Sequence, residues 1–350
     1  MSGLILLYCL TAFTDFPVLG KLRDIWIETA MTTADHQWLA EKFFPRAVIN
    51  KTMSRQVSTD GIVSNPGKVV FGLMKRSDAM SDAPGDGEAA IYADDEQLSY
   101  QKDAVKDARG NKILLYDEEQ DIKIVEISGF STDGIYKGRL LFVSDPSRVV
   151  VRHTSDKGER GELLTSYLKR FDAIAGINGN GFMDTDGKGS GGQILGWSMA
   201  DGELWGSMIP KSASAGFTED GVLVVGTFDD PESYSIRDMV QWGPTLIADG
   251  RKLLSGTGGY GCQPRTALGQ TADGTVILAT VDGRQLHSIG ITVGELADIL
   301  YEYGCVNAAL CDGGSSSVMM YGGEIIGSPS TPMKETGRYL PNAILVLKKD

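Results

Sequence analysis

The sequence predicts an α+β protein: a mixed, largely antiparallel central sheet with flanking helices, preceded by an N-terminal helical arm. From about residue 111, short runs of β-branched and aliphatic residues alternate with glycine-containing turns, which is the pattern of strands with tight connections. Glycine makes up 44 of the 350 residues, nearly twice the average of about 7%. Asp-Gly pairs, which suit hairpin turns, separate many of the runs, at Asp133, Asp186, Asp201, Asp220, Asp249 and Asp273.

The first 110 residues differ in composition from the rest. Residues 3–13 form an uncharged apolar run of signal-peptide length, shorter than the roughly 18 residues that span a bilayer. We therefore interpret residues 1–20 as the remnant of a signal anchor, with a buried helix as the alternative. Residues 21–76 form the predicted helical arm, because apolar residues recur at helical spacing until Pro45. Residues 77–110 form an acidic linker, with nine Asp or Glu against three Lys or Arg.

The predicted domain occupies residues 111–350. Amphipathic spacing predicts a helix over Glu162–Phe171. A second helix is expected over Thr292–Tyr303, because Thr292 and Glu295 form a capping box and Gly304 ends the pattern. The expected strands are Ile122–Ile127, Leu140–Ser144, Val149–Arg152, Ala173–Ile177, Val222–Val225, Thr266–Gln270, Thr275–Val281, Val306–Cys311 and Ala343–Leu347.

Charge and composition exclude several classes of function. The 33 basic and 46 acidic side chains give a net charge of −13, which repels a phosphate backbone and argues against a nucleic-acid partner. Three histidines are too few for a multi-histidine metal centre in one domain, and the four cysteines lack C-x-x-C spacing. No metal or other cofactor is predicted. Whether Cys305 and Cys311 pair is left open.

Several polar residues converge on one edge of the predicted sheet. Arg265 begins a strand that folds back through the turn at 272–274 onto the next strand, which ends at Asp282-Gly283-Arg284. From Asp282 the chain passes through the capped helix into the strand that ends at Asp312. A strand-helix-strand unit of this kind returns parallel, either adjacent or one strand removed. Asp282 and Asp312 should therefore meet at the carboxyl edge, where open sheets bind ligands.

The residues that follow these strand ends are the other candidates. Gly313, Gly314, Ser315 and Ser316 follow Asp312, and their N–H groups and hydroxyls predict an anion cradle. A third strand ends at Asn178-Gly179, which suits hydrogen bonding to a sugar hydroxyl, although an Asn-Gly turn also explains it. Near the C-terminus, Arg338 precedes Asn342 and supplies a second guanidinium for a phosphate clamp.

Taken together, these motifs resemble the phosphodiester glycosidase family, the relatives of the lysosomal uncovering enzyme, whose bacterial members are often labelled exopolysaccharide biosynthesis proteins. The resemblance covers roughly residues 120–350, and its motifs occur in the family's order. Two departures are Asn178-Gly179-Asn180-Gly181-Phe182, where the family usually has N-G-G-F, and Ser315 in place of the third glycine of D-G-G-G-S. The matching motifs are Ile177-Asn178-Gly179, Pro264-Arg265-Thr266-Ala267, Val281-Asp282-Gly283-Arg284, Gly290–Leu296, Cys311-Asp312-Gly313-Gly314-Ser315-Ser316, Arg338 and Pro341-Asn342-Ala343.

The resemblance implies hydrolysis of a sugar-1-phosphodiester of the N-acetylglucosamine-1-phosphate type at the sugar side, in cell-surface glycan metabolism. Arg265 and Arg338 would hold the phosphate, while Asp282 or Asp312 would stabilise the sugar cation, act as nucleophile or activate water. The expected location is extracellular or at the cell surface, with membrane attachment through the N-terminus. The implied catalytic residues are Asp312, Asp282 and Arg265, and the implied substrate-binding residues are Asn178, Gly179, Arg284, Gly313, Gly314, Ser315, Ser316, Arg338 and Asn342.

Two alternatives stay open at this point. The first is a surface carbohydrate-binding or exopolysaccharide-assembly protein with the same pocket and no turnover. The second is a metal-dependent phosphodiesterase in which Asp282 and Asp312 bind Mg²⁺ or Ca²⁺ and the phosphorus–oxygen bond is cut. Neither the sugar, the aglycone nor the stereochemical outcome follows from the sequence.

Overall fold

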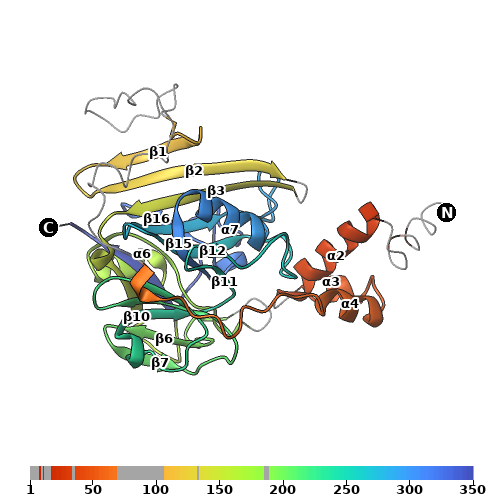
Figure 1. Cartoon of the computed structure of the whole chain (residues 1–350), viewed down its shortest axis with the longest axis horizontal. Coiled ribbons are helices and arrows are strands. Elements are labelled where there is room, and N and C mark those ends of the chain that lie inside the picture. The colour runs from red at the N-terminus through yellow and green to blue at the C-terminus, as the bar shows by residue number, and fades with distance from the viewer. Residues whose placement is uncertain are drawn as a thin grey trace.

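Three antiparallel sheets form the body of the molecule, and a helical arm extends from one side of it (Figure 1). The computed structural model describes Tyr8, Thr11 and residues 17–33, 36–68, 106–131, 134–184 and 189–349. The predicted α+β class with a largely antiparallel sheet is confirmed. Most of the predicted acidic linker and of the N-terminal apolar run lies outside the described residues. Within the described part of the chain, no helix is long and apolar enough to cross a membrane.

The largest sheet has eight strands and holds the predicted carboxyl edge. All of its pairings are antiparallel. Short connections join β1 to β2, β2 to β3, β11 to β12 and β13 to β14, and the remaining pairs bring together strands that are far apart in the chain. Figure 1 shows it above the layer that contains β6, β7 and β10. Its order is β1 (Lys112–Asp117), β2 (Ile122–Ser131), β3 (Gly134–Val143), β14 (Val276–Val281), β13 (Arg265–Thr271), β15 (Cys305–Cys311), β11 (Thr245–Ala248) and β12 (Arg251–Lys252).

Two five-stranded sheets complete the body. A single core cluster includes buried side chains from all three sheets, so the sheets pack around one apolar interior. One sheet has the order β7 (Glu203–Gly206), β6 (Trp197–Ala200), β10 (Ile236–Gln241), β8 (Ser214–Thr218) and β9 (Leu223–Gly226). The other has the order β17 (Glu324–Ile325), β16 (Met319–Tyr321), β5 (Ala173–Asn178), β18 (Asn342–Leu347) and β4 (Val149–His153).

Both helices predicted in the domain are present. α7 (Val293–Glu302) begins after Thr292, whose hydroxyl accepts from the Glu295 N–H while the Glu295 side chain accepts from the Thr292 N–H. This capping box satisfies N–H groups that have no partner within the helix. α7 packs its apolar face on the eight-stranded sheet, and α6 (Leu164–Arg170) packs against β5 and β18. Short 3-10 turns are η1 (Pro66–Lys68), η2 (Pro146–Arg148), η4 (Glu232–Tyr234) and η5 (Gly314–Ser316).

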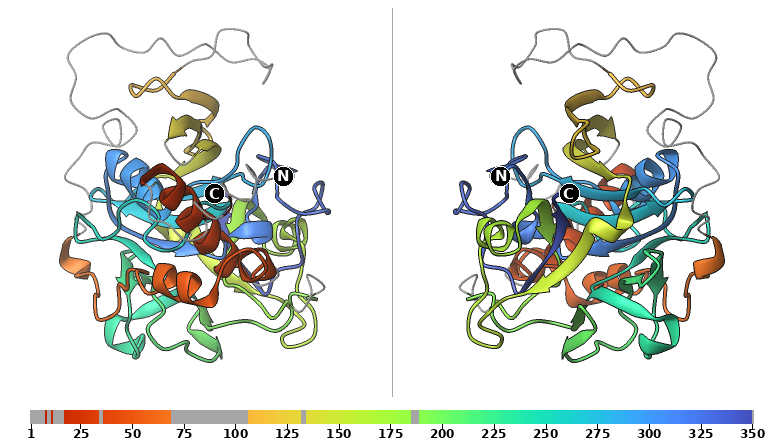
Figure 2. Two further views of the ribbon diagram at one scale, coloured as in Figure 1. Left: turned by 90° about the vertical axis from the view of Figure 1, so that its right-hand side faces the viewer. Right: turned by 90° about the vertical axis from the view of Figure 1, so that its left-hand side faces the viewer.

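The arm contains three short helices with a core of their own. They are α2 (Pro17–Met31), α3 (Trp38–Glu41) and α4 (Arg46–Met53), and Figure 2 shows them against one side of the body. Ile27, Ala40, Phe44 and Ile49 are buried among them. Among the described residues up to 68, the last α-helix ends at Met53 and is followed only by the turn η1, while residues 69–76 of the predicted arm lie outside the described residues. Beyond Met53 the chain crosses the body, where the Ser64 N–H donates to the Val225 carbonyl at 2.9 Å.

The strand register confirms the predicted convergence of strand ends. Arg265 lies opposite Val281 on one side of β13, and Thr266 lies opposite Cys311 on the other side. β14 and β15 are therefore parallel and separated by β13, so that Asp282 and Asp312 leave the same edge of the sheet. With adjacent strands about 4.8 Å apart, the two backbones are about 10 Å apart there.

Candidate active site

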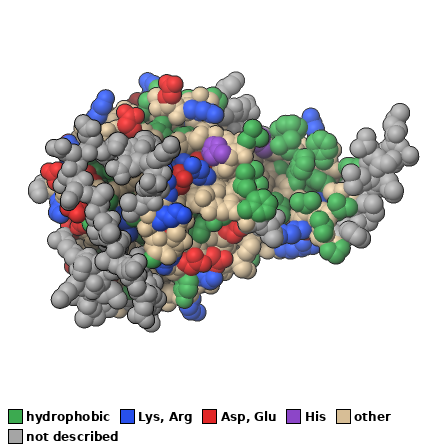
Figure 3. Space-filling view, turned by 90° about the horizontal axis from the view of Figure 1, so that it is seen from above, with side chains coloured by type: hydrophobic (Ala, Val, Ile, Leu, Met, Phe, Trp, Pro, Cys, Tyr) green, Lys and Arg blue, Asp and Glu red, His purple; other side chains and the backbone are tan. Residues whose placement is uncertain are grey.

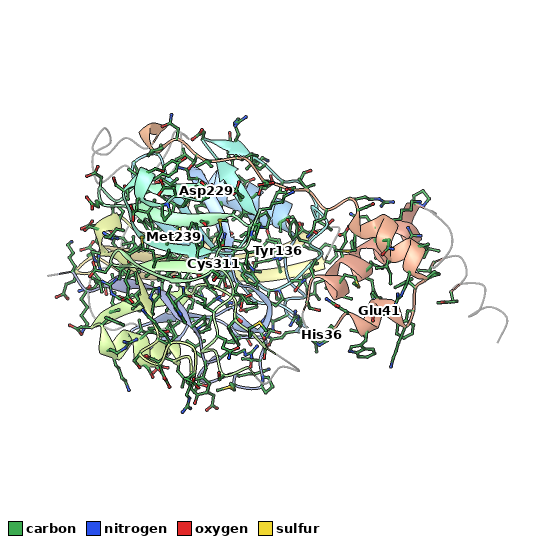
Figure 4. The ribbon with its side chains drawn as sticks, turned by 90° about the horizontal axis from the view of Figure 1, so that it is seen from below. His36, Glu41, Tyr136, Asp229, Met239 and Cys311 are labelled. Carbon is green, nitrogen blue, oxygen red and sulfur yellow. The ribbon has the colours of Figure 1, made fainter. Side chains whose placement is uncertain are left out.

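Asp312 follows β15 and is the partly buried carboxylate of the candidate site. Burial raises its pKa to about 6 from an ordinary value of 3.8, and Asp184 also raises it. Hydrogen bonds from the Ser316 hydroxyl and the Gly313 N–H, together with the Arg338 charge, act in the opposite direction. Burial outweighs these contacts because an ionised carboxylate loses its hydration there. Figure 4 labels the preceding residue, Cys311, inside the body.

Asn178 and Gly179 hold the backbone of Asp312 rather than facing solvent. The Asn178 amide donates to the Asp312 carbonyl at 2.7 Å, and the Asp312 N–H donates to the Gly179 carbonyl at 2.9 Å. Asn178 is fully buried, and its amide oxygen accepts from the Thr266 hydroxyl and the Val318 N–H. The structure therefore corrects the expectation that Asn178 contacts a sugar: it positions the end of β15.

Asn342 is also buried behind the site. Its amide oxygen accepts from the Asn180 N–H at 2.8 Å, and its amide nitrogen donates to the Ser198 hydroxyl at 2.7 Å. A Cβ added at Gly179 would lie 2.5 Å from the same amide oxygen, so only glycine fits there. The predicted direct contact of Asn342 and Gly179 with substrate is corrected in the same way, since both lie in the packing between β5 and β18.

The loop after Asp312 folds into the turn η5, which uses most of its own N–H groups. Gly314 donates to the Pro264 carbonyl at 3.0 Å, and Ser316 donates to the Gly313 carbonyl at 3.2 Å. The predicted cradle of consecutive N–H groups is therefore corrected, because these donors already have partners within the protein. The serine hydroxyls remain at the site. The Ser316 hydroxyl donates to the Asp312 carboxylate, and the Ser315 hydroxyl accepts from Arg338 at 3.0 Å.

Arg338 and Asp184 form an ion pair beside Asp312. The Arg338 Nη1 lies 2.5 Å from the Asp184 Oδ2, and both side chains are 12% exposed. The guanidinium also stacks over the Phe182 ring, 4.7 Å from its centroid. Burial alone would raise the pKa of Asp184, but Arg338 and the Gly189 N–H hold it below its ordinary value. Asp184 was not among the predicted site residues, although it ends the same glycine-rich segment as Asn178.

Arg265 is buried, and its guanidinium supports a loop. It donates to the main-chain carbonyls of Tyr260 at 2.7 Å and Gly261 at 3.2 Å, and burial lowers its pKa to about 10. The expected phosphate contact of Arg265 is thus replaced by a structural one. The physical reason is strand alternation: Thr266 faces Asn178 in the core, so Arg265 points to the opposite face of the sheet.

Arg284 is the exposed guanidinium at this edge. Its Nη2 lies 3.3 Å from the position that a Cβ on Gly314 would take, so the side chain covers the loop after Asp312. The same nitrogen donates to the Gln263 amide oxygen at 3.1 Å. Gln263, which the sequence did not single out, in turn donates to the Thr32 hydroxyl of the arm at 2.6 Å. The arm is therefore connected to Arg284 through one buried amide.

Asp282 belongs to a neighbouring cluster at the same edge. Its Oδ2 lies 2.5 Å from Arg139 Nη1 and 3.2 Å from His287 Nε2, and its Oδ1 accepts from the Ser328 N–H at 3.0 Å. Asp282 is 7% exposed, whereas His287 is 43% exposed. Neither Arg139 nor His287 was predicted. The pairing with Arg139 makes Asp282 a fixed, charge-balanced carboxylate, unlike Asp312.

Within residues 17–33, 36–68, 106–131, 134–184 and 189–349, no three or more His, Cys, Asp or Glu side chains are grouped to hold a metal ion. Cys305 and Cys311 are buried free thiols, which answers the open question about their pairing. Burial raises the pKa of both thiols, so they are poor nucleophiles.

Comparisons with known proteins agree with the motifs. A family model described as phosphodiester glycosidase matches residues 171–347. An uncharacterised SPbeta prophage-derived protein, YomE of Bacillus subtilis (strain 168), is 29% identical over 182 residues, which are 48% of this chain and 27% of that protein. The N-acetylglucosamine-1-phosphodiester alpha-N-acetylglucosaminidase of Mus musculus is 28% identical over 165 residues, 40% of this chain and 31% of the mouse protein. The chain thus matches less than a third of the length of either relative.

A solved structure supports the fold. The zebrafish N-acetylglucosamine-1-phosphodiester alpha-N-acetylglucosaminidase catalytic domain, auto-inhibited by its pro-peptide, aligns with a TM-score of 0.56 at 22% identity. The alignment covers 67% of this chain and 86% of the zebrafish chain. At 22% identity this similarity shows a shared fold.

Proposed function

Because this chain belongs to the phosphodiester glycosidase family, we propose that it hydrolyses the glycosidic bond of a sugar-1-phosphodiester, releasing the free sugar and a phosphomonoester. The observation that supports this most directly is the Asp312 carboxyl, with a pKa raised to about 6, next to the Arg338–Asp184 ion pair. Such a carboxyl is ionised at neutral pH and is more basic than an ordinary aspartate. It is therefore suited to remove a proton from an attacking water.

The leaving group explains why the site needs few acids. An ordinary glycosidase must protonate an alkoxide, whereas a phosphate diester bond to the sugar breaks to give a stable phosphate anion. Cations that stabilise this anion replace much of the work of a general acid. We assign that role to Arg284, which is exposed and lies over Gly314.

Arg338 has a different part in this proposal. It contacts the Asp184 carboxylate and the Ser315 hydroxyl with one nitrogen, so it fixes the wall beside Asp312. Its charge also keeps the pKa of Asp312 from rising further. Asp282, paired with Arg139, positions the turn at 282–289, since the Ser288 hydroxyl donates to the Asp282 carbonyl and the Arg284 N–H donates to the Ile289 carbonyl.

The proposed substrate class is a diester of N-acetylglucosamine-1-phosphate or a related hexose. The mouse relative, named for this activity, supports the choice. The proposed setting is glycan metabolism at the cell surface, which the apolar run at residues 3–13 favours.

The test is to incubate the full chain with the methyl diester of N-acetylglucosamine-1-phosphate in ¹⁸O-water, with and without EDTA. Mass spectrometry then shows which product carries the ¹⁸O. We expect label in the sugar, activity that survives EDTA, and loss of turnover in Asp312→Asn. The control is Asp298→Asn, which changes an exposed carboxylate paired with Lys252 and should leave the rate unchanged.

Two other outcomes would overturn the proposal. Label in the phosphate, with activity lost in EDTA, would indicate a metal-dependent phosphodiesterase. Binding of the diester without turnover, unchanged in Asp312→Asn, would indicate a carbohydrate-binding protein.

A further inference from the structure

We propose that the helical arm, residues 17–56, docks on a membrane surface that contains anionic lipids. The arm displays an apolar stripe made of Val18, Leu22 and Trp26 of α2, together with Trp38 and Phe43, and we call these five residues the arm stripe. Their exposed fractions run from 66% at Val18 to 45% at Phe43. Figure 3 shows hydrophobic side chains gathered over the arm.

The stripe follows from helix geometry. Val18, Leu22 and Trp26 are spaced by four residues, which puts their side chains on one side of α2. The centroid of the Trp26 ring lies 6.0 Å from that of Phe43, so the stripe continues from α2 to the segment just after α3. An exposed apolar group of this extent on an otherwise folded unit indicates an interaction site.

Most of the stripe lies outside the arm's own packing, although the Trp26 ring meets the Phe44 ring edge-on at 6.3 Å and its indole N–H donates to the Leu39 carbonyl at 3.3 Å. The core of the arm lies on other sides of the helices, where Ile27, Ala40, Phe44 and Ile49 are buried. It is also fixed to the body, since the Cys262 N–H donates to the Thr29 hydroxyl at 3.0 Å. Val18, Leu22 and the exposed half of Trp26 therefore form a surface that the packing of the arm leaves uncovered.

The charges around the stripe indicate which partner covers it. The whole chain has a net charge of −13, yet Glu41 is the single exposed acidic residue in the described part of residues 17–56. Asp24 pairs with both Arg23 and Arg55, and Glu28 is buried. Lys42 and Arg46, which flank Phe43 in the chain, are exposed basic residues.

Aromatic side chains next to lysines are typical of membrane interfaces. The Lys42 ammonium lies 4.9 Å from the centroid of the Trp38 ring, so its stem covers apolar surface while its charge remains in water. Tryptophan and tyrosine favour the headgroup region, and basic residues are attracted to anionic lipids. Anionic headgroups would attract Lys42 and Arg46 while the stripe enters the apolar boundary.

A second copy of the chain fits the same surface less well. A twofold contact through the stripe would bring Lys42 and Arg46 of one arm close to the same residues of the other, and like charges repel. Continuity along the chain also favours a bilayer. The apolar run at residues 3–13 directly precedes α2, and the Tyr8 hydroxyl donates to the Phe43 carbonyl at 2.9 Å.

The experiment is flotation of the full chain with vesicles of phosphatidylcholine alone or mixed with phosphatidylserine, at low and high salt. We expect binding to the anionic vesicles that weakens at high salt. The double variant Val18→Gln, Leu22→Gln should lose binding, and Lys42→Gln, Arg46→Gln should lower it about tenfold or more. Hydrolysis of a soluble diester should be unchanged in both variants, which separates this test from that of the proposed function.

Matched controls come from the body. Phe130→Gln removes an aromatic residue that is 85% exposed, and Lys211→Gln removes an exposed lysine, so both should bind like the unaltered chain. Circular dichroism checks that each variant is folded. Equal flotation of the stripe and body variants would overturn the proposal. So would a concentration-dependent dimer that the stripe variant abolishes, because a second copy would then cover the stripe.

Discussion

Replacing Asp312 by asparagine should stabilise the folded protein at neutral pH while abolishing hydrolysis. The pKa of Asp312 is raised from 3.8 to about 6, and at about 1.4 kcal/mol per pKa unit this difference corresponds to about 3 kcal/mol. A raised pKa means that the folded state binds the proton more tightly than the unfolded state. The protonated Asp312 carboxyl therefore contributes its full stabilisation of the folded state below about pH 4, and this stabilisation is lost as the pH rises through about 6.

Asparagine resembles the protonated acid and does not ionise. Urea unfolding followed by tryptophan fluorescence at pH 4 and pH 7.5 should therefore give nearly equal stabilities at the lower pH. At the higher pH, Asp312→Asn should have a free energy of unfolding about 3 kcal/mol larger than the unaltered chain. A residue whose replacement stabilises the fold and removes activity is one that function retains at a cost in stability.

Asp238→Asn is the matched control for a buried carboxylate. Asp238 is fully buried, and its oxygens contact Arg152 and Arg237. Removing its charge leaves two guanidinium groups without their partner, so a loss of about 3–5 kcal/mol is expected. If Asp312→Asn instead destabilised the protein at pH 7.5, or changed stability equally at both pH values, the carboxyl would not be electrostatically strained and its assignment as base would fail.

Three further substitutions test the surroundings of Asp312. Arg338→Lys should lower kcat/KM about 100-fold with little change in Tm, because an ammonium cannot reproduce the contacts of the planar guanidinium with Asp184 and Ser315. An unchanged kcat/KM in a steady-state assay would contradict this. Asn178→Ala should lower the free energy of unfolding by about 2–4 kcal/mol, since it leaves buried hydrogen-bonding groups without partners; a loss below about 0.5 kcal/mol in urea titration would argue against that network. Gln263→Leu should raise KM for the diester more than it lowers kcat, because it removes the amide oxygen that accepts from Arg284. Gln263→Glu keeps an acceptor there and should restore much of the KM. Equal KM values in all three proteins would show that the amide does not position Arg284.

Local chemistry explains which features the sequence predicted. The Thr292–Glu295 capping box, the hairpin turn at 272–274 and the apolar strand runs involve residues a few positions apart, so they are visible in the chain itself. The antiparallel hairpin of Thr266–Gln270 and Thr275–Val281, and the rule that a strand-helix-strand unit returns parallel, then placed Asp282 and Asp312 at one edge of the sheet. Neither argument needed the rest of the fold. The predicted positions of these carboxylates were therefore determined by short-range patterns.

What those side chains contact was decided by segments far away in the chain. Arg265 is covered by the loop at 260–261, Asn178 by β13 and the segment at 318, and Arg338 meets Asp184 across 154 positions. A polar residue at a strand end has the same local signature whether it faces solvent or a neighbouring element. The sequence alone thus determined the elements and the edge at which the carboxylates meet. The tertiary structure decided which polar groups are buried as supports and which remain exposed, because burial depends on packing between distant segments.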